Sequence, residues 1–322
     1  MTRLVLEHLD GLSPFVVRET GATAVTETEA VIDVDDVRDA LGWRMVVAVY
    51  ESLLFDVARP RTLISPEHVA RVAEHLRALP SKFGSFRVSA AGSDSEELLR
   101  WRAALADATG LVDDPDEGEL LIRLRKIGDA WEVLLRLTPR PLATRAWRTE
   151  RFEGGLNATI AAAIVQATNP QPTDRFLDMM CGSGTLLVER LMAGRVSQVV
   201  GYDIDPGALD KTRVHLRNAA IRGAKVELRN EDVLGAVGEF DKLVVNPPWG
   251  TSVGSHAENA TLYPALLEAA ARMAAPHATL CVLTHEIKIF ESALADQPRW
   301  SLADEHRVFG KGHWPRLYVL LT

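Results

Sequence analysis

The sequence predicts an α/β protein in which a doubly wound, mostly parallel sheet follows a mixed α+β region. Three observations in the second half of the chain predict the sheet. Residues 174–178 form a short apolar strand that runs into a glycine-rich turn and then a helix. Two further strands, at 198–203 and 225–229, each lead to an acidic residue, and a fourth strand at 240–245 ends in two prolines. Strands that alternate with helices are typical of a parallel sheet.

The first 140 residues mix short strands with helices, and we find no catalytic cluster among them. Ser65 and Pro66 are typical of a helix N-terminus, and a second helix begins at Ser95 and ends at Gly110. Strands are expected at 4–9, 31–34, 45–50, 84–90, 120–124 and 131–137, and helices at 15–20, 66–79 and 95–109. This mixture predicts an α+β region.

The turn after the strand at 174–178 has the composition of a ligand-binding loop. Asp178 ends the strand, two glycines (Gly182 and Gly184) follow, and an amphipathic helix begins at residue 186. Glycines let the backbone approach a ligand closely, and a helix N-terminus offers unpaired N–H groups. A dinucleotide fingerprint has three glycines and serves a pyrophosphate. An acid at the strand end suits a cationic cofactor that carries an amino acid better than a phosphate.

Acidic residues also follow the next two strands. Asp203 lies 25 positions after Asp178, which is similar to the ~20-residue gap before the ribose-binding acid of doubly wound nucleotide sites. Asp232 follows the third strand and is expected at the same edge of the sheet. A single carboxylate of this kind is more often an exposed loop charge than a ligand. Three in register favour a binding site.

The tetrapeptide Asn246-Pro247-Pro248-Trp249 follows the fourth strand, at the carboxyl end where ligands bind in open α/β sheets. Each proline fixes its φ angle and lacks an N–H. The Asn246 amide and the backbone carbonyl beside it are therefore held as acceptors next to an indole plane. Two acceptors on the hydrogens of a heteroaromatic amine favour its nucleophilic, pyramidal form. The alternative is a Pro-Pro turn that only ends the strand.

With these motifs the chain resembles the class I S-adenosylmethionine-dependent methyltransferases, over residues 145–322. The resemblance implies a Rossmann-like domain with a seven-stranded, mostly parallel sheet, and S-adenosyl-L-methionine as the cofactor. Asp178, Gly182 and Gly184 would surround its methionine part. The full set of cofactor-binding residues that it implies is Asp178, Cys181, Gly182, Ser183, Gly184, Thr185, Asp203, Ile204, Asp232, Val233, Asn246 and Asn157.

The resemblance also assigns roles at the reacting end. Asp203 would hold the ribose hydroxyls and Asp232 the adenine amine, while Asn246, Pro247 and Trp249 would be catalytic and hold the target nitrogen. No metal and no covalent intermediate are needed. In-line positioning of amine and methyl group would supply the catalysis, together with hydrogen bonds that strengthen as the nitrogen becomes cationic.

Three departures from the family pattern bear on the target. Met179 stands where the family usually has proline, Trp249 replaces the commoner tyrosine, and the loop at 250–256 lacks an arginine often found there. The target base or its surroundings can therefore differ from the family's. Asn157 and Thr159 border the cofactor in the family, but helix capping is the alternative role for both.

Net charge and cysteine usage limit the function classes. A net charge of −8 and a pI near 5.6 argue against a general nucleic-acid binder, which is usually basic. A local basic face remains possible at Arg140, Arg145, Arg148 and Arg151, or at Lys311, His313 and Arg316, although solvated surface is an equal alternative.

Cys181 and Cys281 lie far apart, so we expect no disulfide and a cytoplasmic location. No histidine is placed to activate Cys181 as a nucleophile. No apolar run reaches the roughly 18 residues of a membrane span, and the N-terminus lacks the layout of a secretory signal. We expect no membrane partner, and a monomer.

The region from residue 84 to residue 148 resembles the THUMP RNA-binding domain. The resemblance is carried by the strand at 85–88, the helix at 96–108, the strand at 119–124 and the closing run at 135–148. A THUMP domain before an Asn-Pro-Pro-aromatic methyltransferase is the layout of RNA guanine-N2 methyltransferases, and the tRNA-modifying branch is the nearest match.

That layout implies three domains and an RNA partner. The expected divisions are a ferredoxin-like region at 1–80, a THUMP-like domain at 81–148 and the methyltransferase domain at 149–322. The partner is expected to be RNA, above all tRNA, modified at an exocyclic guanine N2. The alternatives are a DNA adenine-N6 methyltransferase, a protein glutamine methyltransferase, and a non-catalytic RNA-binding protein that kept the fold.

Overall fold

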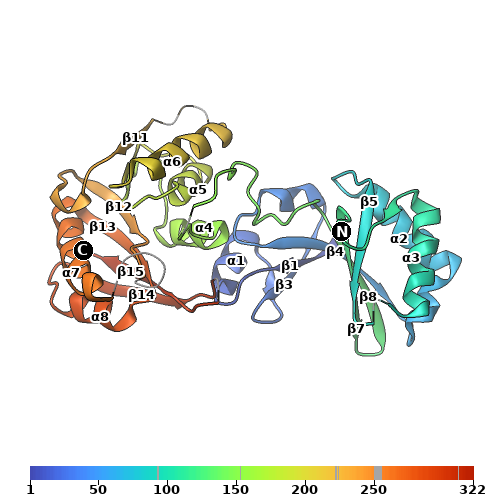
Figure 1. Ribbon diagram of the computed structural model, residues 1–322. Helices are drawn as coiled ribbons and strands as arrows, with labels where there is room; N and C mark the ends of the chain where they lie inside the picture. Colours follow the sequence, from blue (N-terminus) through green and yellow to red (C-terminus); the bar gives the residue numbers. More distant parts are fainter. Residues whose placement is uncertain (93, 153, 222, 224, 250–255, 311) are drawn as a thin grey trace. The chain divides into compact units, whose positions relative to one another are not determined.

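The computed structural model divides into two compact units, each built on one sheet (Figure 1). It describes residues 1–92, 94–152, 154–221, 223, 225–249, 256–310 and 312–322. The first unit comprises Met1–His8 and Val16–Ala143, and the second comprises Leu9–Phe15 and Thr144–Thr322. A single sheet runs through both predicted parts of the first unit, so their division at residue 80 stays a prediction.

The sheet of the first unit has eight strands in the order β2-β3-β1-β4-β8-β7-β5-β6. The strands are β1 (Thr2–Glu7), β2 (Thr23–Ala24), β3 (Glu29–Val34), β4 (Ala48–Phe55), β5 (Ser85–Ala90), β6 (Val112–Asp113), β7 (Leu120–Ile127) and β8 (Ala130–Arg136). The helices in this half of the chain are α1 (Ser13–Thr20), α2 (Pro66–Ala78) and α3 (Glu96–Thr109), with 3-10 turns η1 (Val37–Gly42) and η2 (Pro60–Ile64).

The predicted helix ends are confirmed, and one predicted strand is shifted. Ser65 accepts a hydrogen bond from the His68 N–H, and Gly110 ends α3 with φ 74°. The prediction of a strand at 45–50 was wrong in its bounds, because β4 begins at Ala48 and continues through Glu51 and Ser52 to Phe55. Both polar side chains have partners inside the unit: Glu51 bonds to His75 at 2.6 Å and Ser52 donates to Glu132 at 2.5 Å.

The first sheet is strongly curled. Arg125 on β7 donates to both carboxylate oxygens of Glu29 on β3 at 2.7 Å, although β1, β4 and β8 lie between these strands in the sheet. In a flat sheet, four strand spacings would separate the two backbones by roughly 19 Å. The face that carries Arg125 must therefore be concave.

Helices α2 and α3 pack against each other (Figure 1).

The sheet of the second unit has seven strands in the order β11-β10-β9-β12-β13-β15-β14. Strand β15 is antiparallel to both of its neighbours, and the other neighbouring pairs are parallel. This confirms the predicted seven-stranded, mostly parallel sheet. The strands are β9 (Arg175–Asp178), β10 (Gln198–Tyr202), β11 (Val226–Arg229), β12 (Phe240–Val245), β13 (Ala274–Thr284), β14 (Ser301–Arg307) and β15 (Arg316–Leu321).

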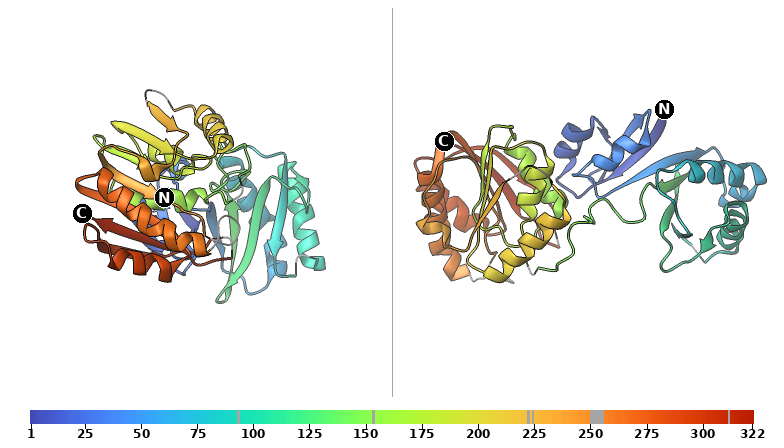
Figure 2. Two further views of the ribbon diagram at one scale, coloured as in Figure 1. Left: turned by 60° about the vertical axis from the view of Figure 1, so that its left-hand side comes forward. Right: turned by 90° about the horizontal axis from the view of Figure 1, so that it is seen from above.

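Helices cover both faces of this second sheet. Figures 1 and 2 show α4, α5 and α6 on one face and α7 and α8 on the other. Their bounds are α4 (Ala158–Ala167), α5 (Thr185–Met192), α6 (Pro206–Asn218), α7 (His256–Met273) and α8 (Ile287–Ala295), and a 3-10 turn, η3 (Val233–Gly235), follows β11. The buried cluster beneath α7 and α8 includes Leu177, Leu243 and Leu280 from three neighbouring strands. Across the described ranges, no helix is both long and apolar enough to cross a membrane.

Candidate active site

Three neighbouring parallel strands bring the predicted site residues to one edge of the second sheet. Asp178, the last residue of β9, is the Cα partner of Gly201 on β10 and of Val244 on β12. Asp203 lies two residues after Gly201, and Asn246 lies two residues after Val244. The predicted cofactor loop and the tetrapeptide therefore start from adjacent strand ends, where the strand order reverses and ligands bind in this class of sheet.

The turn after β9 depends on its two glycines. Gly182 has φ 53° and Gly184 has φ 78°, a left-handed backbone conformation that glycine adopts without strain. A Cβ on Gly184 would lie 2.6 Å from Cγ2 of Thr212, so the site has no room for a side chain. The Thr212 hydroxyl donates to the Gly182 carbonyl at 2.7 Å. Helix α6 thus holds the turn in place.

Asp203 connects this turn to the end of β10. Its Oδ2 accepts from the Gly182 N–H at 2.8 Å, and its Oδ1 accepts from the Asp205 N–H at 2.9 Å. Asn230 donates to the carbonyls of Asp203 and Ile204 at 3.0 and 2.9 Å. The Ile204 side chain is 69% exposed. An apolar surface beside a fixed carboxylate suits a nucleoside, because the acid can accept from ribose hydroxyls while the apolar side chain contacts a base.

Asp232 and Val233 lie at the neighbouring strand end. The Asp232 carboxylate accepts from the Leu234 N–H at 2.9 Å and so caps η3, while Val233 is buried. A carboxylate has about four lone-pair sites, so this cap leaves acceptor capacity. The predicted adenine contact of Asp232 stays a prediction.

Asp178 is buried and incompletely hydrogen-bonded. One oxygen accepts from the Met180 N–H at 3.4 Å, and Oδ2 has no partner in the described part of the chain. Burial, above all, raises the pKa of this carboxyl to about 8. A buried carboxyl of this kind is stabilised in its charged form by a neighbouring cation. The site therefore fits the ammonium or sulfonium end of S-adenosylmethionine.

Four other predicted cofactor residues are engaged inside the fold. The side chains of Cys181, Ser183 and Thr185 are buried. Burial raises the pKa of the Cys181 thiol, which agrees with the prediction that it is no nucleophile. Asn157 caps α4: its Oδ1 accepts from the N–H and the hydroxyl of Thr159 at 2.8 and 2.7 Å.

The tetrapeptide combines open acceptors with one occupied acceptor. Asn246 Oδ1 is buried and has no partner among the described residues. The Pro248 carbonyl accepts from Asn259 at 3.0 Å and from the Tyr263 hydroxyl at 3.2 Å. Within the described ranges no hydrogen bond reaches the Pro247 carbonyl. Asn246 Oδ1 and the Pro247 carbonyl are therefore the acceptors left for a substrate amine.

Two histidines flank Trp249. Neither was predicted in the cofactor-binding or catalytic set, and His313 was named only as part of a candidate basic face. The His285 ring stacks on the indole, with ring centroids 6.2 Å apart and planes at 30°. His313 meets the indole edge-on at 6.5 Å and His285 at 5.1 Å. His285 follows the end of β13, so the rule that selected Asp178 and Asp203 would also have selected it.

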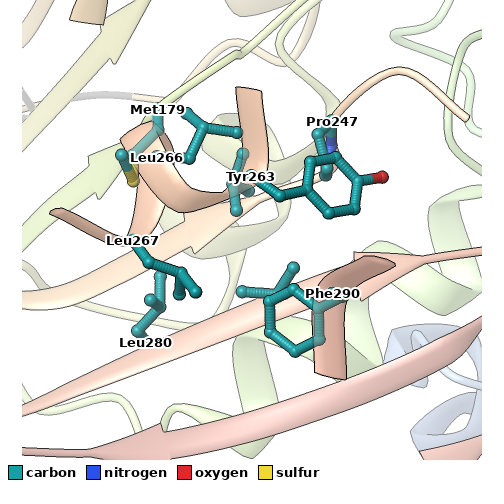
Figure 3. A pocket seen from close by; sticks show the side chains of 9 residues that line it. Met179, Pro247, Tyr263, Leu266, Leu267, Leu280 and Phe290 are labelled. Atoms are coloured by element: carbon teal, nitrogen blue, oxygen red, sulfur yellow. The ribbon is translucent and has the colours of Figure 1, made fainter. Parts of the chain in front are cut away.

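A small cavity lies beside the site but is not part of it. Its volume is about 10 Å³, at the lower limit of what holds one water molecule. Figure 3 shows apolar side chains around it, with Met179 and Pro247 among them. It is a packing gap under the strand ends. The proline that Met179 replaces would reach less far into this space.

Three of the basic residues named as a candidate RNA-binding face have partners within the second unit. Arg145 pairs with Glu189, both buried, at 2.9 Å, and Arg316 pairs with Glu291 and Glu305. Arg148 donates to the Leu156 carbonyl at 2.7 Å. Arg145 is buried and so not available to a phosphate, whereas Arg148 and Arg316 are partly exposed and their contact with RNA stays a prediction. Arg140 and Arg151 are exposed, and Lys311 and the loop at 250–255 lie outside the described residues.

Comparison with known proteins agrees with this geometry. The family model described as RMKL-like, methyltransferase domain matches residues 145–316. The chain is 28% identical over 297 residues to the tRNA (guanine(6)-N2)-methyltransferase of Thermus thermophilus, covering 88% of this chain and 85% of that one. It is 25% identical to the protein of the same name from Methanocaldococcus jannaschii, a match that spans 64% of each chain and so just under two thirds of that relative.

The fold comparison extends over the whole chain. The crystal structure of TrmN from Thermus thermophilus superposes with a TM-score of 0.81 and 24% identity, covering 100% of both chains. A predicted N6-adenine-specific DNA methylase from Listeria monocytogenes gives a TM-score of 0.73 with 17% identity. At these identities the structures show a shared fold. Because the family model covers more than half of the chain, the protein belongs to the RMKL-like methyltransferase domain family.

Proposed function

We propose that the protein transfers a methyl group from S-adenosyl-L-methionine to the exocyclic N2 of guanine in RNA, above all in tRNA. One observation carries this proposal. Asn246 Oδ1 is a buried acceptor without a partner in the described chain, and Asn246 directly follows the strand next to the one that ends in the buried Asp178. Buried polar atoms are nearly always hydrogen-bonded. The unfilled acceptor therefore points to a donor that arrives with the substrate.

The cofactor supplies an electrophilic methyl group when bound. Asp178 would hold its cationic end, and Asp203, Ile204 and Asp232 its nucleoside end. Asn246 Oδ1 and the Pro247 carbonyl would accept the two hydrogens of the target amine. These hydrogen bonds strengthen as the nitrogen becomes cationic, so they stabilise the transition state more than the ground state. Trp249 would stack on the base and offset part of the cost of extruding it.

The first unit supports an RNA substrate. Five cations lie on the segment at 59–82, which includes η2 and α2, and only Glu67 and Glu74 oppose them there. All five are exposed, and none forms an ion pair with another described residue. Arg71 and Arg77 each donate to a backbone carbonyl, of Leu54 at 3.0 Å and of Ala108 at 2.7 Å. Exposed cations without a carboxylate partner are suited to neutralising phosphates. The five are Arg59, Arg61, Arg71, Arg77 and Lys82.

The names of the relatives support guanine N2 over the alternatives. The enzymes from Thermus thermophilus and Methanocaldococcus jannaschii are both named as tRNA guanine-N2 methyltransferases. The Listeria neighbour has a DNA-methylase name, but at 17% identity it supports the fold alone. We also propose a cytoplasmic location, because both cysteines are buried free thiols.

The test is methyl transfer from labelled S-adenosylmethionine to bulk tRNA, plasmid DNA and a release-factor-like protein. We expect label in tRNA alone, and N2-methylguanosine in the digested product by mass spectrometry. Label in DNA or protein would replace this proposal with one of the rival activities. Tight RNA binding without cofactor binding would identify a non-catalytic protein.

A further inference from the structure

Two side chains of α7 donate to the same carbonyl of the tetrapeptide. Asn259 Nδ2 lies 3.0 Å and the Tyr263 hydroxyl 3.2 Å from the Pro248 oxygen. Residues four apart on a helix share one face, so a single face of α7 supplies both donors. A carbonyl has two lone pairs, and here both are used. Asn259 and Tyr263 are 1% and 2% exposed, so water does not compete for these bonds.

These hydrogen bonds restrict ψ of Pro248, a backbone angle that the proline ring does not fix. The proline rings fix φ at Pro247 and Pro248, but ψ of Pro248 still decides where Trp249 lies. The direction of the Pro248 carbonyl is set by that same ψ angle. Holding the carbonyl from α7 therefore fixes the path from the target-binding acceptors to the indole.

The chain of hydrogen bonds extends from Tyr263 to the end of the neighbouring strand, β13. The Tyr263 hydroxyl lies 2.8 Å from Thr284 Oγ1, which accepts from the Glu286 N–H at 2.9 Å. Because Tyr263 gives its only proton to the Pro248 carbonyl, Thr284 must donate to Tyr263. All protons in this buried chain point toward Pro248, an arrangement in which each hydrogen bond polarises the next. His285, which stacks on Trp249, lies between Thr284 and Glu286.

Tyr263 has two separable parts. Its ring lines the apolar cavity beside Pro247, and Figure 3 shows the hydroxyl directed away from that cavity. Burial raises the pKa of Tyr263 to about 12, so the hydroxyl keeps its proton at working pH. A substitution by phenylalanine therefore removes the hydrogen bonds and keeps the packing of the ring.

We propose that Asn259 and Tyr263 are positioning residues for methyl transfer: they hold the Pro248 carbonyl so that Asn246 and Trp249 meet the target base in reactive geometry. The proposal rests on the proposed function for its kinetic readout. Neither residue touches the substrate amine. Their effect is transmitted through the backbone of the tetrapeptide.

The first experiment compares Tyr263→Phe with Tyr318→Phe. Tyr318 is buried in the same unit, but its hydroxyl bonds to Glu291 on α8, away from the tetrapeptide. We expect Tyr263→Phe and Asn259→Ala each to lower kcat for tRNA about tenfold, and the double variant about a hundredfold, because small misplacements of reacting groups cost this much. The Kd for S-adenosylmethionine should stay unchanged, and Tyr318→Phe should retain wild-type kcat.

The threonine offers a second matched pair. Thr284→Ser keeps the hydroxyl and should retain kcat, while Thr284→Val keeps the shape and should lower kcat, by less than Tyr263→Phe does because Tyr263 still donates to the Pro248 carbonyl. Equal kcat in Thr284→Ser and Thr284→Val would overturn the hydrogen-bond chain. Equal losses in Tyr263→Phe and Tyr318→Phe would overturn the positioning role, because general loss of packing or stability would explain both.

A readout without RNA separates this proposal from the proposed function. Protein labelled with 5-fluorotryptophan has a fluorine resonance for Trp249, identified by its absence in Trp249→Phe. Tyr263→Phe should shift or broaden that resonance, and Tyr318→Phe should not. A changed resonance in a protein that methylates no tRNA would refute the proposed function and keep the positioning role. An unchanged resonance in Tyr263→Phe would refute the positioning role.

Discussion

Polar side chains are arranged differently in the two sheets. On the concave face of the first sheet, charged groups form closed sets: Arg123 pairs with Glu7, and Arg125 bonds to both Glu29 and Glu132. Tyr50 donates to Glu7 at 3.0 Å. Each carboxylate here has a cation of the same unit. These contacts hold distant strands of the curled sheet together.

At the carboxyl edge of the second sheet, buried polar atoms lack hydrogen-bond partners among the described residues. Several atoms there have no hydrogen-bond partner in the described ranges, among them Asp178 Oδ2, Asn246 Oδ1, Trp249 Nε1 and Asn259 Oδ1. In the described part of the first unit, buried N–H groups without a partner include Arg87 Nε, Trp101 Nε1 and Trp131 Nε1, which lie on a helix and two separate strands. A protein retains such a cluster at a cost in stability, and the usual reason is function.

Removing the Asn246 amide tests the open edge most directly. We expect Asn246→Ala to lower kcat for tRNA by about a hundredfold to a thousandfold, as for the loss of one preorganised hydrogen-bond partner in a transition state. Cofactor affinity, measured by calorimetry, should remain close to wild type. Asn218→Ala is the control, because Asn218 is exposed and bonds to Thr149 on the surface. Equal loss of cofactor affinity in Asn246→Ala would contradict its assigned role.

Asp203→Ala should do the reverse of Asn246→Ala: it should weaken cofactor binding and leave kcat nearly unchanged. The carboxylate fixes the Gly182 N–H and is predicted to hold the ribose, so its loss removes a ligand contact and loosens the turn. We expect the Kd for S-adenosylmethionine to rise about tenfold to thirtyfold, as for the loss of a charge-assisted hydrogen bond. At saturating cofactor, kcat should change little. Wild-type affinity in calorimetry would reject the ribose contact.

The strand ends could be predicted from the sequence because each apolar run stops at a polar residue. The positions of Asp178, Asp203 and Asn246 follow from that rule alone, and parallel pairing then brings them together. Asn259 and Tyr263 gave no such signal. Tyr263 follows the apolar period of a helix and looks like core, and its partner, the Pro248 carbonyl, lies on a separate loop.

The curl of the first sheet also had no local signal. Arg125 alternates with apolar residues on β7, which is typical of a side chain that faces solvent. Arg125 contacts Glu29 because the curl of the sheet brings β3 close to β7, although three strands lie between them. The same limit applies to Arg145, whose partner Glu189 lies on α5. Sequence patterns predict which face a residue occupies, but not what the fold brings to that face.

Asp178 should make the free energy of unfolding depend on pH in a way that a carboxyl group with a charged partner does not, and this effect should be smaller than the previous two. Its pKa is raised from 3.8 to about 8, so between these pH values the folded protein holds a proton that the unfolded chain has released. The free energy of unfolding should therefore fall as the pH rises toward 8. Asp178→Asn should remove this slope in urea titrations and weaken cofactor binding about fivefold, the loss of one favourable charge.

Asp241 is the matched control for that measurement. Its hydrogen bonds with the Arg175 side chain lower its pKa, so it is ionised in both the folded and the unfolded protein above about pH 5. Asp241→Asn should leave the slope between pH 5 and 8 unchanged. An unchanged slope in Asp178→Asn would show that Asp178 is ionised in the folded protein.

The closed networks of the first sheet should yield the smallest effect, and on stability alone. Arg125→Gln leaves Glu132, 4% exposed, without its cation. An unpaired buried charge costs several kcal/mol, but the Arg125 side chain is 35% exposed, and solvent screening reduces the expected loss to about 1 kcal/mol. Arg100→Gln breaks the exposed pair with Glu96 and should cost under about 0.5 kcal/mol. Urea unfolding measures both. If the two losses were equal, the closed sets would be ordinary surface ion pairs, and the contrast between the two sheets would rest on the open edge alone.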